Sequence, residues 1–474
     1  MRGEGFGGSD WLERPVDGAS LVAFRTMFGL LSFVLALRFF AHDWVRQYYE
    51  TPKFFFSYWG LSWIKPWAAP WMRVHYGGMA ASALGLAFSP WPRRCAGAFT
   101  LLFTYAHFCD QTNYLNHYYL VSLLGLLLTV VPLAPFSSVW PWPKRNPSRE
   151  SPFGGSVSGD PSGKVLVPTV PAWALGLVRF QVGIVYFFGG VAKLKADWIL
   201  YAQPLKIWLG ASTYLPGVGP LLGMTATAYA MSWAGALFDL TIPWLLSWRR
   251  TRLGAYGVVV LFHGITGVLF PIGMFPWIMT LSALVFFPPS WPRSMVARLR
   301  GRWAAETEAR HCLPLTKTRG QRARMALLVL YGAWQCLLPL RHYLYPGNVL
   351  WTEQGFRFAW HVMLMEKTAD TRFRVRDRAS GRTVDVDPRD YLTKYQTKMM
   401  STQPDMILQM AHVLAEDFGQ RGFQEPQVFA DAFVVLNGRP PARLVNPDVD
   451  LAAVQDGFGA MDWLLPAPGR PPEF

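Results

Sequence analysis

A lysine near the end of one long apolar segment is the residue of this chain best placed to do chemistry. The segment runs from Ala172 to Leu194 and ends in the string GGVAKLKADW, so Lys193 lies inside it. A charged side chain at membrane depth is costly and usually faces other protein groups. Burial disfavours the protonated form of an amine, so Lys193 could serve as a base. A lysine that snorkels to the interface remains the alternative, because the segment ends one residue later.

Three histidines occupy comparable positions. His117, His263 and His342 each lie where an apolar segment approaches the same predicted face of the membrane. A single membrane histidine is more often a packed, hydrogen-bonded residue than a catalyst, and that interpretation stays open for each. Their shared depth favours a common pocket with Lys193. No two of them have the close spacing of zinc ligands, so we expect no metal.

The residues after Lys193 predict where the chain returns to water. Lys195, Asp197 and Trp198 follow within five positions and combine charge with an interfacial aromatic side chain. Tryptophan is enriched at the two faces of a bilayer. We therefore expect these three residues to mark the exit of the segment into solvent.

The composition indicates an integral membrane protein. Apolar residues make up 51% of the chain and charged residues only 16%, against about 25% in a typical soluble domain. The net charge of +15 could suggest nucleic acid, but the basic residues cluster in short loops between apolar runs. Positive-inside placement explains such clusters, so we expect membrane lipid and no nucleic acid among the partners.

Nine apolar runs are candidate membrane spans. Several are shorter than the ~20 residues of a simple span, and Pro271 and Pro276 predict a broken or re-entrant pair of helices. With the N-terminus inside, the Arg-rich region around Arg298 is cytoplasmic and the C-terminus is outside, as expected in a bacterial inner membrane. The runs lie near residues 20–40, 75–90, 96–109, 117–134, 172–194, 223–247, 253–270, 273–288 and 325–340.

The character of the chain changes near residue 345. TRFRVRDRASGRTVDV predicts a β-hairpin, Pro404 to Phe418 a helix, and PQVFADAFVVLNGRP a strand that ends in an Asn-Gly turn. A Pro/Gly/Ser-rich stretch, 137–164, predicts a flexible linker. The expected fold is mainly α: a polytopic membrane helix bundle of about nine spans, residues 1–345, followed by a small α+β extramembrane domain, residues 346–474.

Six segments together resemble one known family. The chain is similar, from about residue 20 to 455, to the vitamin K-dependent γ-glutamyl carboxylase and its bacterial HTTM-domain relatives. Any one segment would be a weak signal, but all six follow the order of the family. They are TNYLNHYYL, VRFQVGIVYFFGGVAKLKADW, FHGITGVLFPIGMFPWIM, LPLRHYL, FRFAWHVML and EPQVFADAFVVLNGRPPARLVNPDVDL.

The resemblance implies a role for individual residues. Lys193 matches the catalytic base, the second lysine of a pair whose first position holds Ala192 here. His117, with Asn116 before it, matches a pair in the same pocket, and further positions match pocket residues. These are the histidines His263 and His342, the apolar positions Phe275, Met279 and Met363 that would hold a quinone ring, and Trp360 in the segment that presents glutamate.

The resemblance also implies an activity and its partners. Reduced vitamin K or menaquinol would enter from the bilayer and, with O2, give an epoxide and a strong base. That base would remove a glutamate γ-proton from a peptide or protein before CO2 adds. His361 stands where the family has a different polar residue, so a quinol epoxidase without carboxylation is one alternative. A transporter or an assembly protein is the other, although the inner halves of the spans look too apolar for a polar path.

Overall fold

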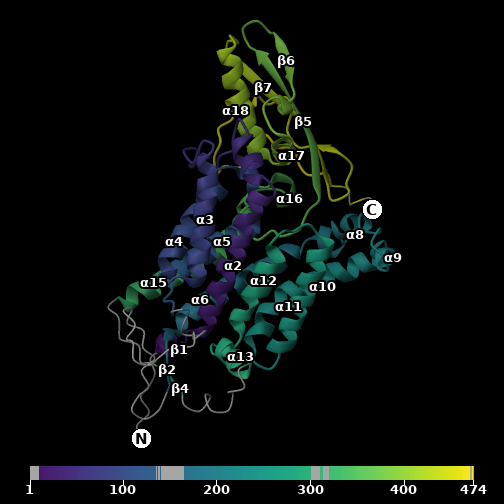
Figure 1. Cartoon of the computed structure of the whole chain (residues 1–474). Coiled ribbons are helices and arrows are strands. Elements are labelled where there is room, and N and C mark those ends of the chain that lie inside the picture. Colours follow the sequence, from purple (N-terminus) through teal and green to yellow (C-terminus); the bar gives the residue numbers. More distant parts are fainter. Residues whose placement is uncertain are drawn as a thin grey trace.

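The computed structural model describes residues 10–134, 136, 139, 165–299, 310–312, 320–469 and 472 of the 474-residue chain. Figure 1 shows two regions along its length, with helices below and a sheet covered by two helices above. The predicted linker, 137–164, lies outside the described residues except for Val139.

Helices occupy the positions of all nine predicted apolar runs. They pack mainly with their neighbours in sequence, α2 on α3, α3 on α4 and α4 on α5, and α6 lies against α10. Their bounds are α2 Ala19–Ala41, α3 Trp71–Phe88, α4 Pro92–Phe108, α5 Asn116–Val130, α6 Ala172–Lys193, α10 Thr225–Ser247, α11 Arg252–Leu269, α12 Phe275–Ala283 and α15 Gln321–Leu337.

Only four helices in the described part of the chain are long and apolar enough to cross a membrane. They are α2, α6, α11 and the continuous helical stretch Gln321–Leu344. The prediction of nine spans is therefore not confirmed. Helices α4, α5 and α12 have 17, 15 and 9 residues, fewer than a simple span needs. Polar residues lower the hydropathy of α3 and α10, which have the length.

The predicted interruption between α11 and α12 is confirmed. Helix α11 ends at Leu269, and α12 begins at Phe275. Pro271 lies in the gap, where a missing backbone N–H removes no helical hydrogen bond. Pro276 lies in the first turn of α12, a position that tolerates proline. After the break, α12 packs against α2 and α6.

The sheet of the C-terminal region is antiparallel, with strand order β6-β5-β7-β8. Alternate residues of β5 and β7 are buried, and helices α17 and α18 pack against these two strands. The predicted hairpin, helix and strand are confirmed. The bounds are β5 Lys367–Asp377, β6 Thr383–Val386, α17 Lys394–Thr402, α18 Pro404–Gln420, β7 Pro426–Leu436 and β8 Ala442–Arg443.

Shorter elements complete the fold. Strand β1 pairs antiparallel with β3, and β2 pairs parallel with β4. Their bounds are β1 Pro15–Asp17, β2 Val165–Val167, β3 Thr169–Pro171, β4 Arg310–Cys312, α1 Asp10–Glu13, α7 Ala196–Ile199, α8 Leu205–Gly210, α9 Gly219–Leu222, α13 Trp291–Leu299 and α16 Val349–Thr352. Short 3₁₀ or π helices are η1 Arg46–Glu50, η2 Gln111–Asn113, η4 Leu284–Phe286, η5 Leu338–Leu344, η6 Pro388–Asp390 and η7 Leu451–Ala453.

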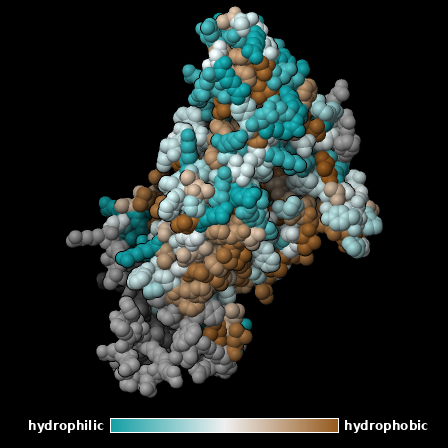
Figure 2. Space-filling view, turned by 45° about the horizontal axis from the view of Figure 1, so that its top comes forward, coloured by the Kyte–Doolittle hydropathy of each residue, from teal (hydrophilic) through white to brown (hydrophobic). Residues whose placement is uncertain are grey.

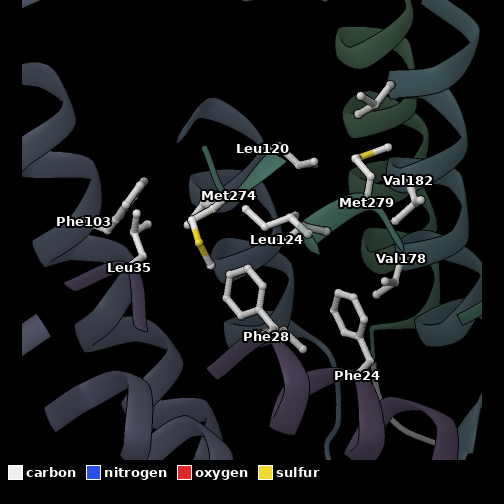
Figure 3. Close-up of a cluster of buried hydrophobic side chains, with 14 of the residues drawn as sticks. Phe24, Phe28, Leu35, Phe103, Leu120, Leu124, Val178, Val182, Met274 and Met279 are labelled. Atoms are coloured by element: carbon white, nitrogen blue, oxygen red, sulfur yellow. The ribbon is translucent and has the colours of Figure 1, made fainter. Parts of the chain in front are cut away.

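The core of the bundle lies where α2, α5, α6 and α12 meet. Their apolar side chains point toward one another in Figure 3. Helices α2, α5 and α6, which are far apart in sequence, are thereby held around α12. The labelled members include Phe24, Phe28, Leu120, Leu124, Val178, Val182, Met274 and Met279.

The surface divides in the same way as the fold. Hydrophilic residues gather over the sheet and α18, and hydrophobic residues form a broad area over the helices (Figure 2). Large apolar side chains such as Trp244, Leu253 and Leu261 are exposed on α10 and α11. Apolar exposure on this scale suits contact with lipid.

Polar contacts seat the C-terminal region on the bundle. Gln409 of α18 accepts a hydrogen bond from the backbone N–H of Ser57 (3.0 Å) and donates one to its carbonyl (2.9 Å). The hydroxyl of Tyr395 donates to the Thr112 carbonyl at 2.9 Å. Because such bonds satisfy loop groups of the bundle, the position of the sheet region is fixed relative to the helices.

Candidate active site

Lys193 lies in the last turn of α6 and is paired with an acid. Its Nζ donates to Asp239 Oδ2 at 2.6 Å and to the Gly189 carbonyl at 3.3 Å. Both side chains are buried, with residue exposures of 5% for Lys193 and 7% for Asp239. Lys193 therefore turns inward rather than snorkelling, and a buried ion pair needs good geometry of this kind to offset desolvation.

A glycine of α6 brings the pair together. A Cβ on Gly190 would lie 2.8 Å from the Leu240 backbone nitrogen and 2.7 Å from its side chain, and one on Gly189 would lie 3.5 Å from Asp239 Oδ2. Only residues without a side chain let helix backbones approach so closely. A Cβ at Gly189 would make an ordinary van der Waals contact, so Gly190 is the residue that sets the α6–α10 separation, and that separation sets the Lys193–Asp239 distance.

The pair forms part of the wall of a cavity whose volume, including its opening to solvent, is about 690 Å³. Most of the lining is apolar and comes from α6, α10, α11, α12 and the loop after Trp360. Five of the residues predicted for the site line this cavity: Lys193, His263, Phe275, Met279 and Met363.

A second polar group lies on α11. The Nε2 atom of His263 is 2.9 Å from the hydroxyl of Tyr186, and the imidazole is almost fully buried. The Nδ1 atom has no hydrogen-bond partner among the described residues. Tyr186 therefore fixes the Nε2 side of the imidazole, while Nδ1 is left for a ligand.

The expected exit to water after Lys193 is wrong for two of its three residues. Asp197 and Trp198 are buried, at 6% and 5% exposed. Asp197 forms an ion pair with Arg439 at 2.6 Å and accepts a hydrogen bond from Asn437 Nδ2 at 2.7 Å. The C-terminal region covers this surface, which hydropathy along the chain could not reveal.

Trp198 closes the cavity next to the lysine. Its ring centre lies 5.2 Å from Lys193 Nζ, and its indole N–H donates to the Ser232 carbonyl at 2.7 Å. A cation over a tryptophan face is attracted to the ring. In the ADW string, Trp198 therefore lies on the cavity wall, and Asp197 binds the C-terminal region.

Phe275 separates this cavity from a second, more open one. Its ring centroid is 5.9 Å from that of His263 and 6.1 Å from that of His117. The second space, called the outer groove here, has a volume of about 1410 Å³ including its opening. Asn116 and His117 line the outer groove, and Phe275 and Met363 line both spaces.

His342 and Trp360 lie outside both linings. The Nδ1 atom of His342 is 2.9 Å from the Pro339 carbonyl, and its ring is 4.8 Å from that of His361. Trp360 is buried and stacks on Tyr119, with ring centroids 4.9 Å apart. His342 therefore packs beside His361, and Trp360 packs on Tyr119, rather than on the wall of either space.

That loop has an unusual backbone. Phe358, Trp360 and Met363 have φ angles of 62°, 58° and 52°, a conformation that is rare outside glycine. Asn116 Nδ2 donates to the His361 carbonyl at 3.0 Å and helps to hold the loop in place. Strained backbone of this kind is concentrated at functional sites, where the surroundings enforce it.

Lys195 lies close to this loop. It is half-buried, and desolvation lowers its pKa to about 8. Burial, together with the charge of Lys195, holds the pKa of His361 well below its usual value. His361 is therefore neutral at physiological pH, and neither of its ring nitrogens has a partner among the described residues.

Asp239 is the site residue that sequence reasoning missed. It is the single acid in the apolar run 223–247, and that was an available signal. An acid and a base that are each isolated at membrane depth are expected to pair. Tyr186 was also missed, because a tyrosine in an apolar helix carries no comparable signal.

Comparison with known families covers most of the chain. Residues 13–152 and 156–291 match the HTTM domain, which amounts to more than half of the sequence. Residues 320–470 match the lumenal domain of vitamin K-dependent gamma-carboxylase. No solved structure matches the chain. Because both domains occur in the order predicted from the six segments, the chain belongs to the family of HTTM-domain membrane proteins related to vitamin K-dependent gamma-carboxylase.

Proposed function

We propose that this protein is a quinol-dependent γ-glutamyl carboxylase-like enzyme in which Lys193 is the base that takes a proton from the hydroquinone. The observation that carries the proposal is the buried Lys193–Asp239 pair on the wall of an apolar cavity. The family match supports the same chemistry. We assign the membrane part to residues 1–345 and the outer domain to residues 346–474.

The cavity suits a reduced vitamin K or menaquinol head group. Its wall is mostly apolar with a few polar groups that converge on it, as is usual for small-molecule sites. Phe275, Met279 and Met363 provide apolar contacts for a ring, and Lys193 and His263 provide polar ends. When bound, the hydroquinone supplies through its reaction with O2 a base strong enough to remove a glutamate γ-proton, after which CO2 adds.

Lys193 and Asp239 form the proton-handling unit of this proposal. A short hydrogen bond joins Nζ to Oδ2, so a proton of this ion pair can pass from the amine to the carboxylate. In an apolar cavity the neutral form of such a pair avoids the cost of two buried charges. The amine can then accept a proton from a ligand hydroxyl within reach.

The remaining residues orient ligands and exclude water. Tyr186 fixes one nitrogen of His263, and the other can hydrogen-bond a quinol oxygen. The apolar walls keep water from a reactive base. Asn116 and His117 lie in the outer groove, from which the glutamate of a peptide or protein substrate would approach. Trp360 and His342 support the loop that carries Met363.

We assign the C-terminal domain to the outside of a bacterial inner membrane. Arg249 and Arg250 occupy the turn between α10 and α11, and Arg252 begins α11. Helix α13, with Arg298, lies at the end opposite the sheet (Figure 1). Clustered basic residues favour the cytoplasmic side. Reporter fusions at Gly347 and Arg302 should report opposite compartments, and a shared compartment would overturn the assignment.

The activity can be tested with purified protein in nanodiscs. Reduced quinone, O2, labelled bicarbonate and a glutamate peptide are supplied, and quinone epoxide and labelled peptide are measured separately. Wild type should form both products and Lys193→Ala neither, whereas Lys206→Ala should leave both unchanged. Epoxide without labelled peptide would favour the epoxidase alternative. Neither product from wild type, with vitamin K and with menaquinol, would refute the proposal.

A further inference from the structure

The outer groove contains polar donors that the protein does not use. Arg38, at the outer end of α2, lines the groove, and no carboxylate among the described residues lies within ion-pair distance of its guanidinium. Asn113 also lines it and is 93% buried, with an Nδ2 that has no hydrogen-bond partner in the described structure. A buried amide donor left unpaired costs free energy, so a ligand that accepts from it gains affinity.

The guanidinium of Arg38 is held in place by an aromatic ring. Its central carbon lies 5.3 Å from the centre of the Trp44 ring, and the Trp44 ring stacks on His42 at 4.8 Å. Stacking occupies the face of a guanidinium and leaves its N–H edge available for a planar anion. Arg38 is therefore oriented without being neutralised.

The charge of the groove favours an anion. No Asp or Glu is among the described residues that line it, while Arg38, Asn113 and His117 all offer donors. A carboxylate is the planar anion that arginine binds through two parallel hydrogen bonds. The groove shares Phe275 and Met363 with the Lys193 cavity, so a ligand held here lies next to the proposed reaction.

We propose that Arg38 and Asn113 form a carboxylate subsite that binds the side-chain carboxylate of the substrate glutamate in the outer groove. This inference rests on the proposed function for the identity of the ligand. Lipid phosphate is the competing anion for an arginine at a helix end, but the Asn113 amide is too deeply buried to meet a head group at the membrane surface.

The subsite can be tested by binding and by kinetics. A short capped glutamate peptide and its glutamine counterpart are titrated into protein in zwitterionic nanodiscs, and the KM values for peptide and quinol are measured. Arg38→Gln should weaken glutamate peptide binding and raise its KM by about tenfold, because one charge-assisted contact is lost. The affinity for the glutamine peptide and the KM for quinol should each change by less than about twofold.

Three further variants separate recognition from folding. Arg38→Lys should restore part of the preference for glutamate, and Arg46→Gln should change nothing, since Arg46 is exposed and paired with Asp43. Asn113→Asp should weaken the glutamate peptide more than the glutamine peptide, because it adds a negative charge beside the ligand.

The outcomes distinguish this inference from the proposed function. If no carboxylation occurs yet the preference for the glutamate peptide depends on Arg38, the subsite stands and the proposed function fails. If wild type shows no preference, or Arg38→Gln keeps it, the subsite is refuted. If anionic lipid in the nanodiscs abolishes glutamate peptide binding to wild type and to Arg46→Gln alike, Arg38 is a lipid contact and the inference is wrong.

Discussion

The Nζ atom of Lys193 lies 2.6 Å from Oδ2 of Asp239, although the two residues are 46 positions apart and belong to different helices. Each is the partner that makes burial of the other tolerable. Removing one member of such a pair strands a charge and costs about 3–5 kcal/mol, whereas replacing both with apolar residues is often neutral.

Single substitutions in this pair should therefore affect stability as well as activity. Lys193→Met and Asp239→Leu should each lower the thermal midpoint and abolish epoxide formation, and the double variant should recover the midpoint but not the activity. Thermal unfolding in detergent and the epoxide assay measure the two effects. A double variant no more stable than either single variant would show that the two side chains do not interact.

The sequence was sufficient to locate the helices and five residues of the cavity. Apolar runs of the right length mark helices, and the strand and turn patterns of β5, β6 and β7 are local. Asp239 could not be identified as the partner of Lys193 in the same way, because their contact depends on how closely α6 and α10 approach. Asp197 was misjudged for a related reason: its burial is due to Arg439, which lies in another part of the chain.

Lys195 should make the stability of the protein depend on pH. Its pKa falls from 10.5 to about 8 in the folded state, so between these values the unfolded chain binds more protons. Stability should then rise as pH increases from 8 to 10.5, and the protonated amine should destabilise the fold below pH 8.

Lys195→Met tests this dependence. The variant should be more stable than wild type at pH 7, and the difference should shrink at pH 10, as measured by thermal unfolding. Lys53→Met, at an exposed lysine, controls for the loss of a surface charge. A difference for Lys195→Met that stays constant from pH 7 to pH 10 would contradict the lowered pKa.

The polar role of His263 can be separated from its volume. His263→Gln keeps a group that can hydrogen-bond Tyr186, whereas His263→Leu leaves the tyrosine hydroxyl buried without a partner, at a cost of about 1–3 kcal/mol. The Gln variant should therefore retain more epoxide formation and a higher thermal midpoint. The same pair of changes at His412, in α18 of the C-terminal region, should spare activity. Equal activity in the two His263 variants would mean that packing alone matters there.

The spacing of α6 and α10 gives the last prediction. A methyl group at Gly190 would meet Leu240 at distances of 2.7 to 2.9 Å, including its backbone nitrogen, so the helices must separate. Overpacking of this kind typically costs about 1–3 kcal/mol. Because the separation also sets the Lys193–Asp239 hydrogen bond, Gly190→Ala should reduce epoxide formation more than its loss of stability explains.

Gly176 provides the matched control on the same helix. It is exposed, and a Cβ there would have no heavy atom within 4 Å. Alanine is the better helix former by about 1 kcal/mol, so Gly176→Ala should be neutral or slightly stabilising and fully active. Thermal midpoints and epoxide rates of the two variants, measured below their midpoints, decide the matter. If Gly190→Ala is as active as Gly176→Ala, close approach of α6 and α10 is not what holds the lysine and the aspartate in register.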